Sequence, residues 1–177
     1  LPDIEHMAAQ ITSKTKAIVV INPNNPTGAV YPKETLQAIA TLAVKHQLVL
    51  FSDEIYSDIL FDQCEYHRLA QFAEGTLTIT FDGLSKNYLL AGYRCAWMVC
   101  SGATIQAKDY LEGINKLLSM RLCANVPAQH AVAVAVGVLF TFGAYMASIS
   151  RQRWYVAGAR MGLAGIVVAV INVFLPG

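Results

Sequence analysis

Short apolar runs of strand length alternate along this chain with longer stretches in which apolar residues recur at helical spacing. The strand-like runs cover residues 17–21, 48–51, 76–81 and 96–100. One helix is predicted between the first two runs and another over residues 104–120. This alternation is typical of an α/β protein with a mostly parallel sheet, because a helix can carry the chain back to begin the next parallel strand.

Each predicted helix has one apolar side, which we expect to face the sheet. The first helix begins after Tyr31, where Pro32 is acceptable in the first turn and the acidic Glu34 is favourable. Its apolar side consists of Leu36, Ile39, Ala40, Leu42 and Ala43. The apolar side of the second helix consists of Ile105, Tyr110, Leu111, Ile114, Leu117 and Leu118.

Polar residues follow three of the predicted strands at the point where each strand ends. Ile21 is followed by Asn-Pro-Asn-Asn-Pro-Thr-Gly, Phe51 by Ser-Asp-Glu, and Phe81 by Asp-Gly-Leu-Ser-Lys. In open parallel sheets, ligands bind just outside the carboxyl ends of the strands. The order of these segments therefore predicts one crevice that combines amide, carboxylate, hydroxyl and amine groups.

Taken one at a time, these residues have ordinary explanations. The asparagine-proline segment is typical of a turn, Asp53 could cap a helix, and Lys86 could be a surface lysine. Tyr56 could be a core aromatic residue. The functional interpretation rests on the fixed order of the segments, each of which follows a strand.

These segments resemble the class I and II aminotransferases, which use pyridoxal phosphate on fold type I. Residues 22–28 are similar to the family's asparagine-proline loop, 52–56 (Ser-Asp-Glu-Ile-Tyr) to its aspartate-tyrosine segment, and 83–94 to its cofactor-attachment signature. The residues in these motifs are most similar to those of the bacterial alanine (glutamate–pyruvate) aminotransferases. The resemblance implies a three-layer α/β/α fold with a mostly parallel sheet, as part of the large cofactor-binding domain.

The resemblance implies that Lys86 is the catalytic residue. Its amine would form the Schiff base with pyridoxal phosphate and would move the substrate α-proton. Asp53 would pair with the pyridine nitrogen. Asn25 and Tyr56 would hydrogen-bond the phenolic oxygen, and Asn25 could also contact the substrate carboxylate.

Ser85 and Arg94 are the phosphate ligands that the resemblance implies, since a hydroxyl donor and a permanently charged planar fork suit an anion. Gly83 stands where many relatives have a serine, and Cys95 stands where the family usually has an aliphatic residue. We therefore expect phosphate binding to depend on groups outside these 177 residues as well.

The implied activity is transfer of an amino group between an amino acid, alanine or glutamate, and a 2-oxo acid, in a protein that forms a homodimer. The family's chain is roughly twice this length, so the fragment alone is expected to be weakly active or inactive. Two alternatives stay open: a pyridoxal-phosphate-dependent lyase or synthase on the same fold, and a non-catalytic truncated protein with a membrane- or partner-binding tail.

The similarity extends from residue 1 to about residue 137, and residues 138–177 form a divergent apolar tail. Residues 131–150 and 161–177 carry no Asp, Glu, Lys or Arg, so a membrane hairpin has to be considered. A core helix buried on two faces would have a similar pattern. A frame-shifted segment and a small-domain remnant are the other interpretations of the tail.

The amino-acid composition excludes further classes of protein. A formal net charge of +1 with 14% charged residues argues against a nucleic-acid binder, and 55% hydrophobic residues argue against a disordered chain. The cysteines at 64, 95, 100 and 123 form neither a CxxC pair nor a metal-ligand spacing. They predict buried thiols in a cytoplasmic protein, and no metal site.

Overall fold

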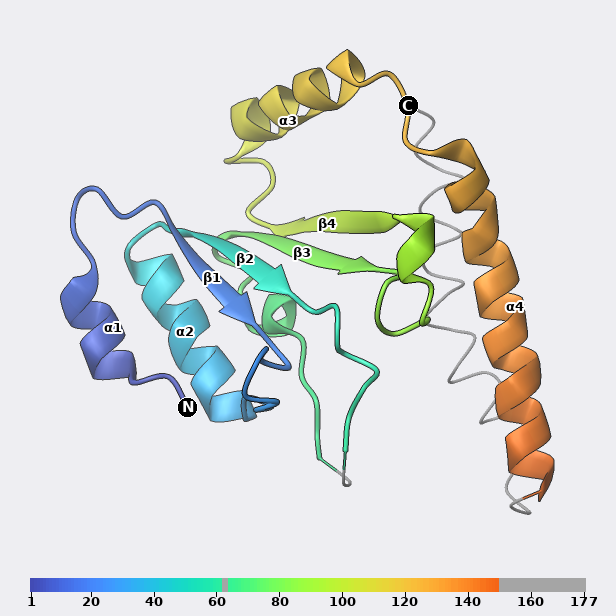
Figure 1. The fold of residues 1–177 in the computed structure, drawn as a ribbon. Coiled ribbons are helices and arrows are strands. Elements are labelled where there is room, and N and C mark those ends of the chain that lie inside the picture. The colour runs from blue at the N-terminus through green and yellow to red at the C-terminus, as the bar shows by residue number, and fades with distance from the viewer. Residues whose placement is uncertain (62–63, 150–177) are drawn as a thin grey trace.

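A four-stranded sheet forms the centre of the computed structural model, which describes residues 1–61 and 64–149 (Figure 1). Its strands are β1 (Ala17–Ile21), β2 (Val49–Asp53), β3 (Leu77–Gly83) and β4 (Ala96–Gly102), in the order β1-β2-β3-β4. β1, β2 and β3 are parallel, and β4 is antiparallel to β3. The four predicted strands and the mostly parallel sheet are confirmed, with small differences at the strand ends.

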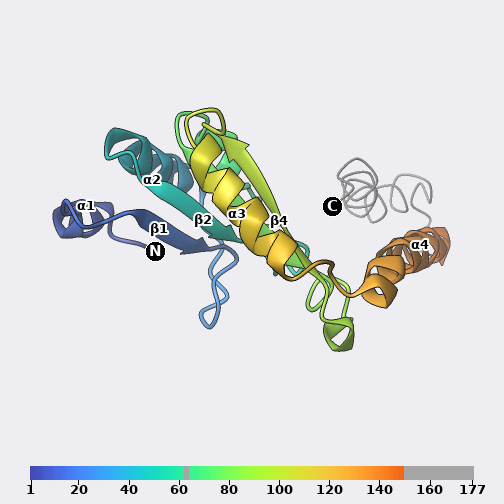
Figure 2. The ribbon, with the colours of Figure 1, turned by 90° about the horizontal axis from the view of Figure 1, so that it is seen from above.

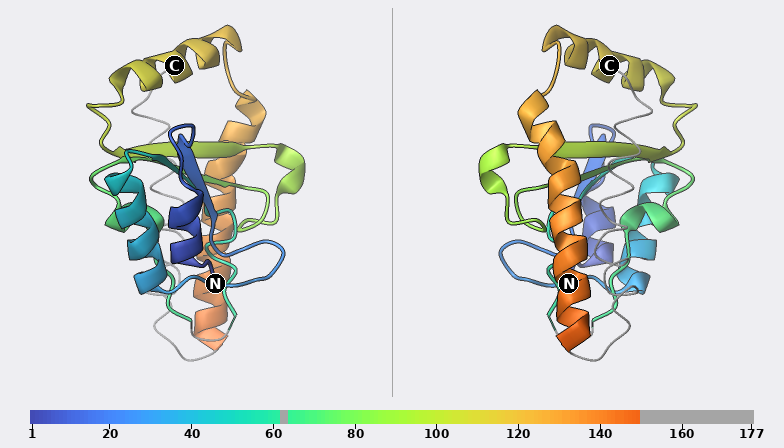
Figure 3. Two further views of the ribbon diagram at one scale, coloured as in Figure 1. Left: turned by 90° about the vertical axis from the view of Figure 1, so that its left-hand side faces the viewer. Right: turned by 90° about the vertical axis from the view of Figure 1, so that its right-hand side faces the viewer.

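One face of the sheet is covered by α1 (Ile4–Gln10) and α2 (Lys33–Lys45) (Figures 1 and 3). The α2 helix begins at Lys33, so Pro32 is its N-cap and not part of its first turn as predicted. The five apolar residues predicted to face the sheet are buried. Four of them, Leu36, Ile39, Ala40 and Ala43, pack with Val20, Leu50 and the short 3₁₀ helix Leu69–Phe72 in the main hydrophobic core.

The opposite face of the sheet is crossed by α3 (Lys108–Met120), as Figures 1 and 2 show. This helix begins later than the predicted 104–120, because residues 103–107 form turns after β4. None of the α3 residues is buried, and Leu117 and Leu118 are 68% and 53% exposed. The apolar side predicted for this helix therefore exists, but it is not buried against the sheet.

The last described helix, α4 (Val126–Ile149), stands beyond the end of the sheet and continues through position 137 (Figures 1 and 2). One side of it packs on the segment after β3, where Leu84 and Tyr88 meet Val132, Ala135 and Val136. Positions 133, 137 and 140, on the other side, are exposed in this chain. Burial of this helix on two faces in a larger enzyme stays a prediction. A domain boundary at 137 stays a prediction.

No helix within residues 1–61 and 64–149 is long and apolar enough to cross a membrane. The run 161–177 lies outside the described residues.

The cysteines are less buried than expected. Cys64 and Cys123 are exposed, because both lie in connecting segments that have no apolar side to bury. Cys95 and Cys100 are half-buried, and burial raises the pKa of both thiols. The expectation of four buried thiols is therefore wrong for Cys64 and Cys123.

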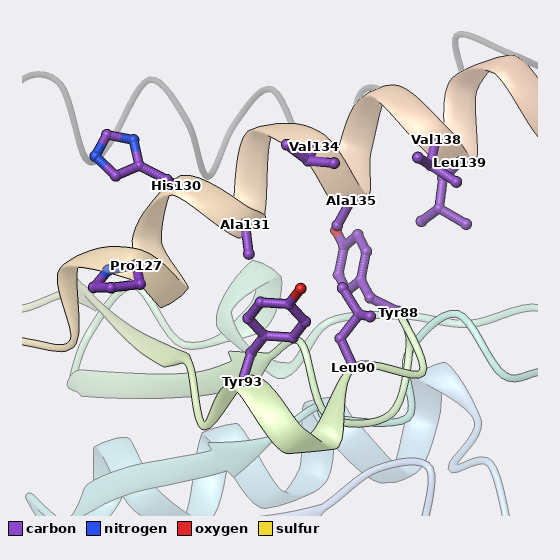
Figure 4. A pocket seen from close by; sticks show the side chains of 10 residues that line it. All are labelled: Tyr88, Leu90, Tyr93, Pro127, His130, Ala131, Val134, Ala135, Val138 and Leu139. Carbon is purple, nitrogen blue, oxygen red and sulfur yellow. The ribbon is translucent and has the colours of Figure 1, made fainter.

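A cavity of about 380 Å³ lies between α4 and the segment after β3 (Figure 4). Apolar side chains of α4 and the rings of Tyr88 and Tyr93 line it, with His130 at one end. Burial raises the pKa of Tyr88 to about 12, and its ring lies edge-on to Trp97. This cavity contains none of the six predicted site residues in its lining.

Two buried threonines near the start of β3 give a matched stability test. Within the part of the chain that the structure describes, the Thr78 hydroxyl has no hydrogen-bond partner, whereas Thr76 Oγ1 donates to the Leu48 carbonyl oxygen at 2.6 Å. Thr78→Val should stabilise the protein by about 1 kcal/mol, because an unpaired buried hydroxyl is removed, and Thr76→Val should destabilise it by about 1–3 kcal/mol. Urea unfolding measures both changes, and a loss of stability in both variants would contradict this account.

Candidate active site at the carboxyl edge of the parallel strands

The ends of the three parallel strands lie side by side. Asp53 is in register with Ile21 on one side and Phe81 on the other. Backbone hydrogen bonds continue the pairing past the strands, since the Asn22 N–H donates to the Asp53 carbonyl oxygen and the Glu54 N–H to that of Phe81, both at 3.0 Å. The three polar segments therefore leave the sheet at the same edge, as predicted, and a single crevice shared by all of them stays a prediction.

The loop after β1 is held at its base by Asn22. Its side-chain oxygen accepts the Tyr31 N–H at 2.9 Å, and its amide nitrogen donates to the His67 carbonyl oxygen at 3.4 Å. Beyond that base, Gly28 has φ +71 and its N–H donates to the Asn24 carbonyl oxygen. Asn25 is consequently exposed at the tip of a closed loop.

Asn25 and Tyr56 line one cavity of about 270 Å³ together with Pro23, Ile59 and Phe61. Tyr56 belongs to the turn after β2. This turn begins at Asp53, whose carboxylate accepts the Ile55 N–H at 3.2 Å. The loop after β1 and the turn after β2 thus form the walls of a single depression.

Lys86, in the segment after β3, lies beside Tyr56. Its Nζ lies 5.7 Å from the centroid of the Tyr56 ring, which is within the range of a cation–π contact. Tyr56 therefore shares a cavity with Asn25 and lies beside the Lys86 amine, and Asp53 ends the strand that leads into the Tyr56 turn.

The two residues predicted to bind phosphate lie in the same connection between β3 and β4. Ser85 is half-buried directly before Lys86. Arg94 is exposed, has a left-handed backbone with φ +52, and donates from Nη1 to the Ala91 carbonyl oxygen at 3.1 Å. The Arg94 guanidinium thus bonds within its own turn.

A buried ion pair that sequence reasoning missed lies beneath the site. Glu54 is fully buried; Ser52 Oγ donates to its Oε1 at 3.0 Å, and Arg68 Nη1 donates to its Oε2. Tyr66 donates to the Asn22 carbonyl oxygen at 3.3 Å. Residues 66–68 thus tie the β1 and β2 exits together. The sequence did contain one signal. Alternate residues of a strand point to opposite faces, so Ser52 and Glu54 point into the core, whereas Asp53, between them, points the other way.

Asn87 is a second residue that sequence reasoning missed. Its amide nitrogen donates to Ser57 Oγ at 3.2 Å and to Asp82 Oδ1 at 3.3 Å, and its oxygen accepts the Asp58 N–H at 3.3 Å. This residue connects the segment after β2 to the end of β3. An asparagine beside a lysine carries no distinctive sequence pattern.

Asp82 is the most perturbed carboxyl group at this edge. Burial, the largest effect, raises its pKa to about 6, while the Gly83 N–H, which donates to Oδ1 at 2.7 Å, opposes the shift. The carboxylates of Asp58 and Glu54 add to the increase. In the described residues, His, Cys, Asp and Glu form no group that could hold a metal ion.

Several known proteins have similar sequences. The sequence model described as aminotransferase class I and II matches residues 2–170. Glutamate-pyruvate aminotransferase AlaA of Escherichia coli K12 is 56% identical over 136 residues, which are 77% of this chain and 34% of that protein. Alanine aminotransferase of Mycobacterium tuberculosis H37Rv is 54% identical over the same length, 77% of this chain and 32% of that protein.

The chain belongs to the class I and II aminotransferases. It spans about a third of the length of the curated relatives that it matches. A crystal structure of an aminotransferase from Escherichia coli superposes with a TM-score of 0.72 at 56% identity, over 74% of this chain and 32% of that one. The expected three-layer α/β/α fold of type I is thereby confirmed.

The Glu54–Arg68 pair yields a stability prediction. Arg68→Met leaves a fully buried carboxylate without its cation and should cost about 3 kcal/mol, the low end for a buried pair because the Arg68 side chain is 45% exposed. Adding Glu54→Gln removes the charge and should recover part of the loss. Urea unfolding of both variants tests this, and a double variant no more stable than Arg68→Met would contradict it.

The Asp82 carboxyl group predicts a pH dependence of stability. Because its pKa is higher in the folded chain than the ordinary 3.8, the folded state binds this proton more tightly, and stability falls as pH rises from about 4 through about 6. Asp82→Asn keeps the oxygen that accepts the Gly83 N–H and should remove this decline. Unfolding free energies at pH 4 to 8 measure it, and parallel curves for the variant and the unmodified chain would refute it.

Proposed function

We propose that this chain is the lysine-bearing part of a pyridoxal-phosphate-dependent enzyme that transfers an amino group between an amino acid and a 2-oxo acid. The observation that supports this most directly is the position of the Lys86 amine beside the Tyr56 ring, at the edge where Asp53 ends β2. Family membership alone does not say where Lys86, Tyr56 and Asp53 lie relative to one another in this chain.

The groups at this edge suit the cofactor's chemistry. Asp53 would accept the hydrogen bond of the ring nitrogen and keep its proton there, which a neutral amide could not do. Tyr56 and Asn25, which share a cavity, would donate to the phenolic oxygen. Ser85 and Arg94 would hold the phosphate, as donors to an anion. We infer that the donor set fits pyridoxal phosphate.

When bound, pyridoxal phosphate supplies an aldehyde that combines with amines and a ring that withdraws electrons from the substrate α-carbon. Lys86 Nζ would hold that aldehyde carbon before substrate binds. Once a substrate amine has taken its place on that carbon, the freed Nζ would accept and return the substrate α-proton. Asn25 would orient the substrate by donating to its carboxylate. Apolar Ile59 and Phe61, which line the cavity beside Tyr56, would limit access of water.

Alanine with 2-oxoglutarate, and glutamate with pyruvate, are the substrate pairs that we propose. The support is that relatives 53–56% identical over 77% of this chain carry the names glutamate-pyruvate and alanine aminotransferase. We also propose a cytoplasmic homodimer for the whole protein. The isolated 177 residues should be weakly active or inactive, because they span about a third of those relatives.

Replacement of Lys86 tests the assignment. In the longer protein of which we propose this chain is a part, Lys86→Ala should lower kcat by a factor of about 10³ or more, because it removes both the covalent attachment and the proton carrier. The assay follows pyruvate and glutamate formed from alanine and 2-oxoglutarate. Visible absorption of the bound cofactor should change in the same variant.

Lys108→Ala, which alters an exposed lysine at the start of α3, is the matched control and should retain full activity. Release of pyruvate with ammonia instead of glutamate would identify a lyase. An unmodified protein that binds no pyridoxal phosphate would overturn the proposed function.

A further inference from the structure

The side chain of Asn87 forms a hydrogen-bonded bridge between the segment after β2 and the segment after β3. Its two N–H groups donate to Ser57 and Asp82, and its oxygen accepts the Asp58 N–H. A carboxamide suits these three partners because it combines two donors with an acceptor in one plane. The residue is half-buried, so water competes with these bonds less than at a fully exposed site.

The two ends of this bridge are adjacent in sequence to Lys86 and Tyr56, whose separation matters for the proposed site. Asn87 directly follows Lys86, and Ser57 directly follows Tyr56. The remaining backbone bonds of residues 84–90 do not reach the segment after β2: the Leu89 N–H donates to the Lys86 carbonyl oxygen and the Leu90 N–H to that of Leu84. The Leu84 N–H donates to the Cys95 carbonyl oxygen, directly before β4. Those bonds shape the turn without fixing its distance from Tyr56.

Asp82 anchors the same bridge to the sheet. Its Oδ1 accepts both the Gly83 N–H and the Asn87 amide. The carboxamide therefore joins the turn to the end of β3 and to the segment after β2. A shift of about 1 Å in a reacting group is enough to lower a rate substantially.

We infer that Asn87 is a positioning residue whose bridge from Asp82 to Ser57 and Asp58 holds the Lys86 amine over the Tyr56 ring. The inference rests on the proposed function for its catalytic meaning. The bridge itself can be tested in the protein without cofactor.

An exchange of the two side chains gives the sharpest test. Asn87→Asp loses both donated bonds and places a carboxylate against that of Asp82. The double variant Asp82→Asn/Asn87→Asp restores the pair with donor and acceptor exchanged, because the new amide at 82 can donate to the new carboxylate at 87. Ser57 Oγ and the Asp58 N–H can both donate to that carboxylate. The double variant also has the net charge of the unmodified chain.

Amide hydrogen exchange of residues 84–90 and cofactor affinity are the two measurements. In the protein without cofactor, Asn87→Asp should speed exchange of these amides about tenfold or more, and the double variant should return it to within about threefold. In the loaded protein, the pyridoxal phosphate dissociation constant and kcat should follow the same order, with KM for alanine changing less. Asn115→Asp, at an exposed position on α3, adds the same charge and should change none of these values.

Each outcome decides the inference. Faster exchange in Asn87→Asp that the double variant does not rescue would show a purely structural role and overturn it, as would unchanged exchange in the single variant. If Asn87→Asp does not fold, Asn87→Ala, which removes all three bonds without adding a charge, takes its place, and unchanged exchange of residues 84–90 in that variant would overturn the inference. Rescue of exchange in a protein that binds no cofactor would leave the bridge in place and refute only the proposed function.

Discussion

Parallel pairing of β1, β2 and β3 decides where the chemical groups of this chain lie. Because Ile21, Asp53 and Phe81 are in register, the three segments that follow them leave the sheet at the same edge. The strands bury Val20, Leu50 and Ile79, and α2 covers one face with its apolar side. The hydrophobic core thereby sets the position of polar residues that contribute little to it.

Polar side chains then fix the loops relative to one another, which the sheet alone does not do. Asn22 ties the loop after β1 to residues 31 and 67, and Glu54 ties the turn after β2 to Arg68. Asn87 ties the turn after β3 to Ser57 in the segment after β2. A buried carboxylate is costly unless it is paired and hydrogen-bonded. Both carboxylate oxygens of Glu54 are hydrogen-bonded, and these bonds fix the turn after β2 relative to residue 68.

The sequence was informative where one local rule determined the structure. Apolar periodicity predicted the strands and the buried side of α2, and the polar strand exits predicted the shared edge. It was not informative about Arg68, because the partner of Glu54 lies 14 residues away and only the folded chain brings the two together. Asn87 was missed for the same reason, with Ser57 30 residues distant. Periodicity also identified the apolar residues of α3 but not their exposure, since a pattern does not specify what the helix contacts.

Several unfavourable features of this chain lie in the segments that follow the strands, whereas Gln47 and Leu122, which also have positive φ, and Thr78, whose hydroxyl has no hydrogen-bond partner among the described residues, lie elsewhere. Asp82 has a raised pKa, Glu54 is a charge in the interior, and Leu89 and Arg94 adopt positive φ. A left-handed backbone costs a residue with a side chain about 1–2 kcal/mol. The α2 side of the core, by contrast, is built from well-packed Leu, Ile and Ala. Local rules of stability are commonly broken at functional sites and compensated elsewhere. Asp82, Glu54, Leu89 and Arg94 lie in segments that leave the edge carrying Lys86, so the proposed function of this edge gives a reason why their cost is tolerated.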